Sequence, residues 1–173
     1  VNPLFDVMSF VQGQSPYIFG YAMAEDTAAV MNLLKTDDIS QMMPRNTELL
    51  WGANPIEFED GNRQFTLFGV NSEVEMTGEV IEDASIQFDP VSNAPEVAMG
   101  MNSEGARIWS RITGANIGKP VAIVLDNYIV SYPNVQTKIT GGNSTITGLG
   151  DVAEAEDLVN ILLSGALPAP LEI

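Results

Sequence analysis

Two spacings of hydrophobic residues alternate along the chain, one typical of helices and the other of strands. In residues 25–34 and 152–162 the apolar positions recur every three to four residues, which predicts two amphipathic helices. Asp151 and Glu154 have the spacing of a capping box, so the second helix is expected to begin directly after Asp151. Gly165 is its predicted stop, because glycine readily takes the left-handed conformation that ends helices.

Short runs rich in β-branched and aromatic residues predict strands joined by turns. The run 121–125 (VAIVL) is apolar throughout, which is typical of a strand buried on both faces. Asp60-Gly61 and Asp126-Asn127 are turn sequences that predict hairpins. Residues 138–147 (KITGGNSTIT) predict a strand pair interrupted by glycine. The remaining strands are expected at 17–22, 47–51, 55–59, 63–70, 81–88, 96–101, 128–132 and 171–173.

A third helix is predicted to begin at Asn102 or Ser103, which can cap it, and its inward face should carry Ala106, Trp109, Ile112 and Thr113. Residues 37–43 predict a short helical turn stopped by Pro44, and residues 1–15 a partly helical lead-in. This order of elements predicts an α+β fold of mixed, mainly antiparallel sheets with helices packed on one side.

Composition limits the size and partners of this fold. A chain of 173 residues, 45% of them hydrophobic, can bury a core as one compact domain or as two small lobes. The formal net charge of −16 disfavours nucleic acid and anionic lipid surfaces. Because the acidic residues are interspersed along the chain, they are interpreted mainly as a solvated surface, and otherwise as an attraction for basic segments or cations.

The residue types that are missing exclude several kinds of chemistry. There is no cysteine, so disulfides and thiolate metal sites are excluded. There is no histidine, which excludes Ser-His-Asp and Cys-His mechanisms. No run approaches the roughly 20 apolar residues that span a bilayer. The start Val1-Asn2-Pro3 lacks an initiator methionine and a signal peptide, so the chain is expected to be a piece of a longer protein.

Paired carboxylates are the remaining candidates for catalysis or metal binding. They occur at Asp37-Asp38, at Glu82-Asp83 and within residues 57–60 and 154–157. Neighbours in a strand point to opposite faces, so solvated surface is the preferred interpretation. Residues 57–62 only partly match a calcium loop, and Gly141-Gly142 lacks the lysine of a phosphate-binding loop. No catalytic, cofactor-binding or metal-ligating residue, and no cofactor, is therefore predicted.

Met42 and Met43, followed by Trp51, are the candidates for an adaptable apolar binding surface. Methionine side chains accommodate irregular partners, which suits such a surface. The competing interpretation is that all three residues fill the core.

The second half of the chain resembles one family in five short motifs that occur in the right order. The motifs are GEVIEDA (78–84), NSEGA (102–106), NIGKPVAIVLD (116–126), ITGG with ITG (139–142 and 146–148), and SGALPAPL (164–171). Together they resemble the first large extracytoplasmic domain of the SecD/SecDF protein-export family. Ser164 stands where that family usually has a positive residue, and Tyr132 where it usually has a small one.

The resemblance implies a base with ferredoxin-like elements into which a mobile head is inserted. Residues 1–77 would form an elaborated N-terminal lobe, 78–148 the head, and 149–173 a helix and strand that return to the base. The head would swing about connections near Gly78 and Gly148.

The resemblance also implies a function. The domain would lie on the extracytoplasmic, periplasmic side of the bacterial inner membrane, anchored by membrane helices outside this chain. It would contact unfolded preprotein and, with the Sec channel and a SecF-type subunit, assist export driven by the proton gradient. It would not be an enzyme.

Two other classes of protein remain open from the residues alone. An extracytoplasmic binding module for glycan or another protein would equally lack catalytic residues. A carboxylate-based hydrolase would need two carboxylates about 5 to 9.5 Å apart in a cleft, one of them with a raised pKa.

Overall fold

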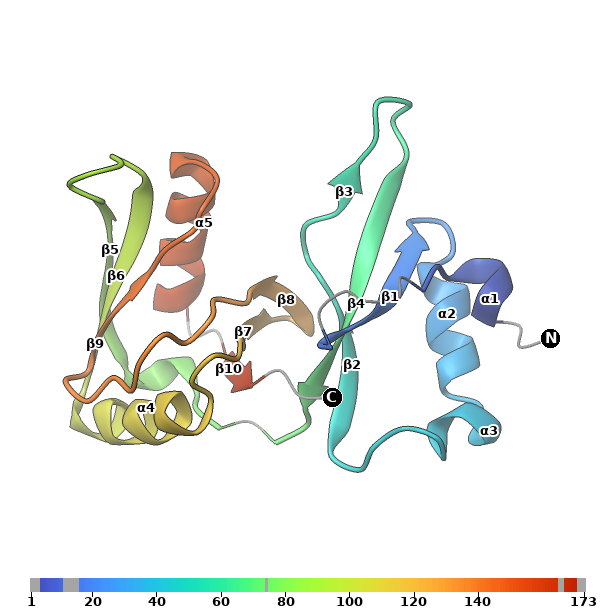
Figure 1. The fold of residues 1–173 in the computed structure, drawn as a ribbon, viewed down its shortest axis with the longest axis horizontal. Coiled ribbons are helices and arrows are strands. Elements are labelled where there is room, and N and C mark those ends of the chain that lie inside the picture. Colours follow the sequence, from blue (N-terminus) through green and yellow to red (C-terminus); the bar gives the residue numbers. More distant parts are fainter. Residues whose placement is uncertain (1–3, 11–15, 74, 165–166, 171–173) are drawn as a thin grey trace. The chain divides into compact units, whose positions relative to one another are not determined.

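The chain divides into two compact units. The computed structural model describes residues 4–10, 16–73, 75–164 and 167–170 (Figure 1). The first unit contains the described residues up to Ser72 together with 127–129, and the second contains those of 73–126 and 130–170. The division thus falls at Ser72 and Glu73, slightly before the predicted boundary at 77/78. The described residues after 148 lie with the second unit.

The first unit is an antiparallel sheet with three helices. Its central strand β4 (Arg63–Asn71) lies between β1 (Ile18–Met23) and β2 (Thr47–Trp51), and the short β3 (Ile56–Glu57) also pairs with β4. The helices are α1 (Leu4–Val7), α2 (Thr27–Leu34) and α3 (Asp37–Ser40). Residues 67–70 of β4 are all buried, as expected for a strand covered on both faces. Leu67, with Val30 and Leu34 of α2, is part of the core cluster of this unit.

The second unit contains two three-stranded antiparallel sheets and two longer helices. One sheet has the order β5 (Ile81–Phe88), β6 (Pro95–Met101), β9 (Asn143–Ile146); the other has the order β10 (Leu167–Pro170), β7 (Val121–Leu125), β8 (Tyr128–Ser131). Residues 128 and 129 of β8 are grouped with the first unit. The helices are α4 (Ser103–Ala115), α5 (Val152–Leu163) and the 3-10 turn η1 (Gly78–Val80). All ladders between named strands are antiparallel, which confirms the predicted α+β class.

Both predicted caps are present at the long helices. The Asn102 side chain accepts a hydrogen bond from the Gly105 N–H at 2.8 Å, and the Asp151 carboxylate accepts one from the Glu154 N–H at 2.8 Å. The Glu154 carboxylate accepts a hydrogen bond from the Gly150 N–H at 2.7 Å. Each cap thus satisfies one of the orphan N–H groups of the first turn, and both helices begin where the sequence predicts.

The predicted inward face of α4 is largely confirmed. Trp109, Ile112 and Thr113 are buried, while Ala106 is half-buried. Gly105 is buried in addition, because it packs so closely against Val80 that an added Cβ would lie 2.8 Å from the Val80 Cβ.

The strand pair predicted for residues 138–147 is wrong, because only β9 forms there. Gly142 has a positive φ of 73°, and its carbonyl accepts a hydrogen bond from the Met101 N–H at 2.8 Å. The Ile139 N–H donates to the hydroxyl of Thr113 on α4 at 2.9 Å. These contacts use backbone groups that a second strand would have needed for its ladder.

The chain returns from α5 as the edge strand β10, which the sequence did not predict. Its two prolines, Pro168 and Pro170, lack N–H donors, and an edge position tolerates that loss. The strand predicted at 171–173 and the helix stop predicted at Gly165 lie outside the described residues.

Candidate functional site

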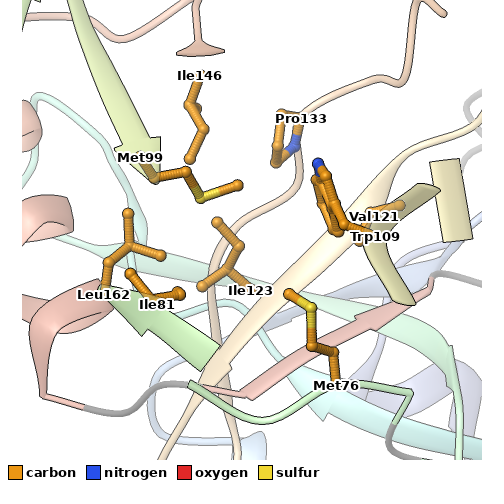
Figure 2. A pocket seen from close by; sticks show the side chains of 9 residues that line it. All are labelled: Met76, Ile81, Met99, Trp109, Val121, Ile123, Pro133, Ile146 and Leu162. Carbon is orange, nitrogen blue, oxygen red and sulfur yellow. The ribbon is translucent and has the colours of Figure 1, made fainter. Parts of the chain in front are cut away.

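The core of the second unit contains a small apolar cavity (Figure 2). Met99 of β6, Trp109 of α4 and Ile123 of β7 contribute to its wall, and all of its lining area is apolar. Leu162 of α5 and Met76, which precedes η1, complete it on other sides. The cavity volume of about 20 Å³ is room for roughly one water molecule or one methyl group. The site can therefore hold an apolar group but supplies no acid, base or metal ligand.

Trp109 brings an unsatisfied donor into this core. Its side chain is 6% exposed, and its indole Nε1 is buried without a hydrogen-bond partner. A buried donor left unpaired costs about 1 to 3 kcal/mol, so such groups are uncommon in folded proteins. Trp109 therefore places a polar atom at a cost in stability within the core beside the cavity.

None of the carboxylates that the structure describes lines the apolar cavity of the second unit. Glu82 and Asp83 of β5 are exposed, as are the carboxylates of residues 57–60 and those of 154–157. No group of three or more acidic side chains close enough to hold a metal ion occurs in the described ranges.

Asp89, in the turn between β5 and β6, has a shifted pKa. Hydrogen bonds from the Ser92 N–H at 2.6 Å, the Ser92 hydroxyl at 2.9 Å and the Val91 N–H at 3.0 Å hold the pKa of its carboxyl below the ordinary value. A carboxyl group that acts as a general acid requires a raised pKa, so the shift at Asp89 has the opposite direction.

The three predicted apolar contact residues do not share one surface. Met42, shortly after α3, is 80% exposed, and Met43 is half-buried. Trp51 is only 8% exposed and belongs to the core cluster of the first unit. Neither methionine lines the cavity of the second unit.

The sequence analysis placed Trp109 and residues 121–125 in the core, but it did not predict that they line a cavity. Val97, Met99 and Met101 alternate in β6, and this period of two was the available signal for a core face. Met76 and Leu162 reach the same cavity from distant parts of the chain, and no local pattern predicts that.

The two predicted hinge glycines both lie inside the second unit. Gly78 is buried at the start of η1. Gly148 is exposed, has a φ of 79°, and has open space around the position of a Cβ. The chain passes from the first unit to the second before either glycine, at Ser72 and Glu73.

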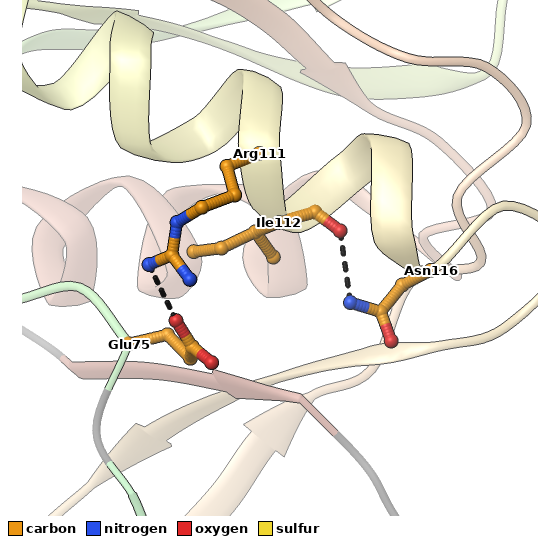
Figure 3. Close-up of polar contacts among 4 residues, drawn as sticks. All are labelled: Glu75, Arg111, Ile112 and Asn116. Carbon is orange, nitrogen blue, oxygen red and sulfur yellow. Dashed lines mark hydrogen bonds and ion pairs between the residues drawn. The ribbon is translucent and has the colours of Figure 1, made fainter.

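An ion pair attaches the first segment of the second unit to α4 (Figure 3). Arg111 donates to the carboxylate of Glu75 at 2.6 Å, and Asn116 donates its amide to the Ile112 carbonyl at 2.8 Å at the end of the helix. Side-chain exposures of 64% for Arg111 and 22% for Glu75 leave this pair accessible to solvent. No helix in the described part of the chain is long and apolar enough to cross a membrane.

Comparisons with known proteins identify the family. The model of the SecDF P1 head subdomain matches residues 54–169. The chain is 52% identical over 173 residues to the protein translocase subunit SecD of Rhodothermus marinus, covering 99% of this chain and 27% of that protein. It is 34% identical over 152 residues to SecD of Desulfurispirillum indicum, covering 88% of this chain and 30% of that protein.

A solved structure agrees with these sequence matches. The crystal structure of SecDF from Thermus thermophilus, described as a translocon-associated membrane protein, matches with a TM-score of 0.50 at 26% identity, covering 79% of this chain and 22% of that one. The chain thus spans between a fifth and a third of each of these relatives. With the family model matching well over half of its residues, the chain belongs to the SecD/SecDF family of protein translocase subunits and carries the P1 head subdomain.

Proposed function

We propose that this chain is an extracytoplasmic part of a Sec translocase accessory subunit that contacts translocating preprotein and assists export driven by the proton gradient. The observation that carries the proposal is the match of the P1 head model to residues 54–169, which include nearly all of the second unit. The Sec channel and a SecF-type subunit are the partners that family membership suggests for the parent protein.

The surface chemistry of the described residues supports contact with an unfolded chain. An unfolded polypeptide has no fixed shape, so its binding surface should offer adaptable apolar groups or open strand edges. Met42 offers such a group because 80% of its side chain is exposed. The outer strands β5 and β9 of the first sheet in the second unit each pair only with β6 among the described strands. Met76 and Met99 line the apolar cavity and can repack around an inserted side chain.

The head is proposed to move during this work. Gly148 is the better of the two candidate hinges, because it is exposed and its surroundings are open, whereas Gly78 is buried. Nothing lies within 4 Å of the position of a Cβ on Gly148, and glycine itself adopts a wide range of dihedral angles.

The test uses the full-length parent protein with a preprotein stalled in the channel. A photo-crosslinking amino acid replaces Met42 in one variant and Lys35, an exposed residue outside the proposed contact, in a matched control. Crosslinks to the stalled chain are expected from position 42 and not from position 35. Equal crosslinking from both positions, or none from position 42 in an export-competent variant, would contradict the proposed contact.

A further inference from the structure

Positive charge is concentrated in one part of this acidic protein. Residues 105–150 contain four of the seven basic residues and only one of the 23 acidic residues, Asp126. That segment carries a formal charge of +3 (4 − 1), and the rest of the chain carries −19 (3 − 22). The formal charge of this stretch is therefore opposite in sign to that of the rest of the chain, although Glu104 and Asp151 directly flank it.

Three of these four cations lie along the exposed side of α4. Arg107 and Arg111 are four residues apart and Gly114 follows on the same helical face, while the exposed Glu104 lies one turn before Arg107. Lys138 joins them, because its Cδ atom would lie 3.2 Å from a Cβ placed on Gly114. The aliphatic stem of Lys138 thus lies over Gly114, with its side chain exposed. Arg107, Arg111 and Lys138 are called the α4 basic face below.

The basic face already binds one carboxylate. Arg111 holds Glu75 at 2.6 Å, and Glu75 comes from a chain segment outside the helix. Neither Arg107 nor Lys138 has an ion pair among the residues that the structure describes. A helix dipole favours cations at the C-terminal end of a helix, but Arg107 lies in the first half of α4, so the dipole does not account for it.

The spacing of the cations indicates the form of the missing partner. That partner would share Arg111 with Glu75, whose hydrogen bond uses the Nη2 atom of the five-donor guanidinium. Arg107 and Arg111 are separated by about 6 Å along the helix axis, from four residues at about 1.5 Å each. Alternate residues of an extended chain project to the same side about 6.6 Å apart. Guanidinium groups favour carboxylates because they can donate two parallel hydrogen bonds.

We propose that the α4 basic face is a docking surface for an extended acidic segment of a partner protein, with carboxylates at alternate positions. An anionic membrane is a poorer partner, because Trp109 and Ile112 on the apolar side of α4 are buried in the core and are not available for insertion. A broad anionic lipid surface would also face the acidic parts of the molecule, whose net charge of −16 repels it. A narrow peptide can contact the basic face alone, at a distance where salt screens the more distant acidic residues. This inference does not depend on contact with preprotein.

The experiment measures binding of a fluorescent peptide to this chain by anisotropy at low salt. The probe is a peptide of about a dozen residues that alternates glutamate and serine. The comparison peptide has the same composition, but adjacent pairs of glutamates alternate with pairs of serines, so that no two glutamates are two residues apart. We expect the alternating peptide to bind more tightly than the paired one, and its affinity to fall as salt is added. Equal affinity of the two peptides, or no binding at low salt, would overturn the proposal.

Paired substitutions assign the binding to the basic face. The double variant Arg107→Gln, Lys138→Gln should weaken binding by about threefold to tenfold, the sum of two exposed ion pairs. The double variant Lys35→Gln, Arg45→Gln makes the same change in net charge at two exposed positions of the first unit and should leave affinity unchanged. Equal weakening in both double variants would mean nonspecific attraction. Anionic lipid vesicles are added as competitors. If they displace the peptide from the unmodified chain and do not bind the Arg107→Gln, Lys138→Gln variant, the partner is a membrane and the proposed docking of an acidic peptide is wrong.

Discussion

The hydroxyl of Thr113 accepts a hydrogen bond from the Ile139 N–H at 2.9 Å and donates its own hydrogen to the Trp109 carbonyl at 2.8 Å. Thr113 is fully buried on α4, and Ile139 belongs to the irregular segment that precedes β9. One side chain therefore satisfies a backbone donor that lies 26 residues away along the chain. This bond attaches that segment to the helix.

Replacing Thr113 by valine should destabilise the protein by about 1 to 3 kcal/mol. The shape of the side chain is nearly kept, but the partly buried Ile139 N–H loses its acceptor. Unfolding in urea, followed by circular dichroism, measures the change. Thr145→Val is the control, since its exposed hydroxyl accepts only from the exposed Gln87 at 3.3 Å, and its effect should stay within about 0.5 kcal/mol. Equal effects of the two substitutions would contradict the role given to Thr113.

Filling the cavity should stabilise the second unit. Val121 lines the cavity, so Val121→Ile adds one methylene where space exists and should stabilise by up to about 0.8 kcal/mol. Val97 is fully buried and does not line the cavity, so Val97→Ile should instead cost about 1 to 3 kcal/mol through overpacking. Thermal unfolding distinguishes the two, and a loss of stability in both variants would show that the space is too small to use.

Gly142→Ala should cost more stability than Gly118→Ala. Both glycines have a positive φ, 73° and 77°, so alanine is strained at each by about 1 to 2 kcal/mol. At Gly142 the new methyl would also lie 3.0 Å from the Ala106 Cβ and 3.3 Å from the Met101 carbonyl, whereas nothing lies within 4 Å at Gly118. Denaturant midpoints of the two variants test this order, and the reverse order would contradict it.

Asp89 should titrate below its ordinary pKa of 3.8, because the Ser92 N–H, the Ser92 hydroxyl and the Val91 N–H stabilise its ionised form. Because the pKa is lower in the folded state than in the unfolded state, ionised Asp89 stabilises the fold at pH values above the ordinary pKa. This stabilisation is lost as the pH falls through the folded-state pKa. The side-chain carboxyl signal in an NMR titration gives the midpoint directly. Ser92→Ala should raise the midpoint, while Ser85→Ala, an exposed serine on β5, should not. An unchanged midpoint in Ser92→Ala would exclude the hydroxyl as a cause.

Local signals in the sequence were sufficient for elements whose bonding is local. Asn102 and Asp151 cap their helices as predicted, because a cap needs only the next three residues. Asp126 and Asn127 both have positive φ, 50° and 64°, at the predicted turn between β7 and β8. In the same way the period of 3.6 in α4 identified Trp109 as a core residue.

The candidate site was less predictable, because its parts meet only in the folded chain. The local sequence does not distinguish Met42 from Trp51, because both are apolar residues near the end of a helix or strand. In the fold, however, Met42 is 80% exposed and Trp51 is 8% exposed. Burial depends on what other elements cover each side chain. The cavity between α4, α5 and the sheets has no local signature for the same reason.

The sequence by itself determined the element types, the α+β class, the absence of cysteine and histidine chemistry, and the family motifs. The tertiary structure alone decided that residues 138–142 form no strand, that β10 pairs with β7, and that Lys138 lies over Gly114 on α4. Each of these depends on a partner distant in sequence. A backbone donor such as the Ile139 N–H bonds to whichever acceptor lies beside it in the fold. The residues next to Ile139 in the sequence do not specify that acceptor.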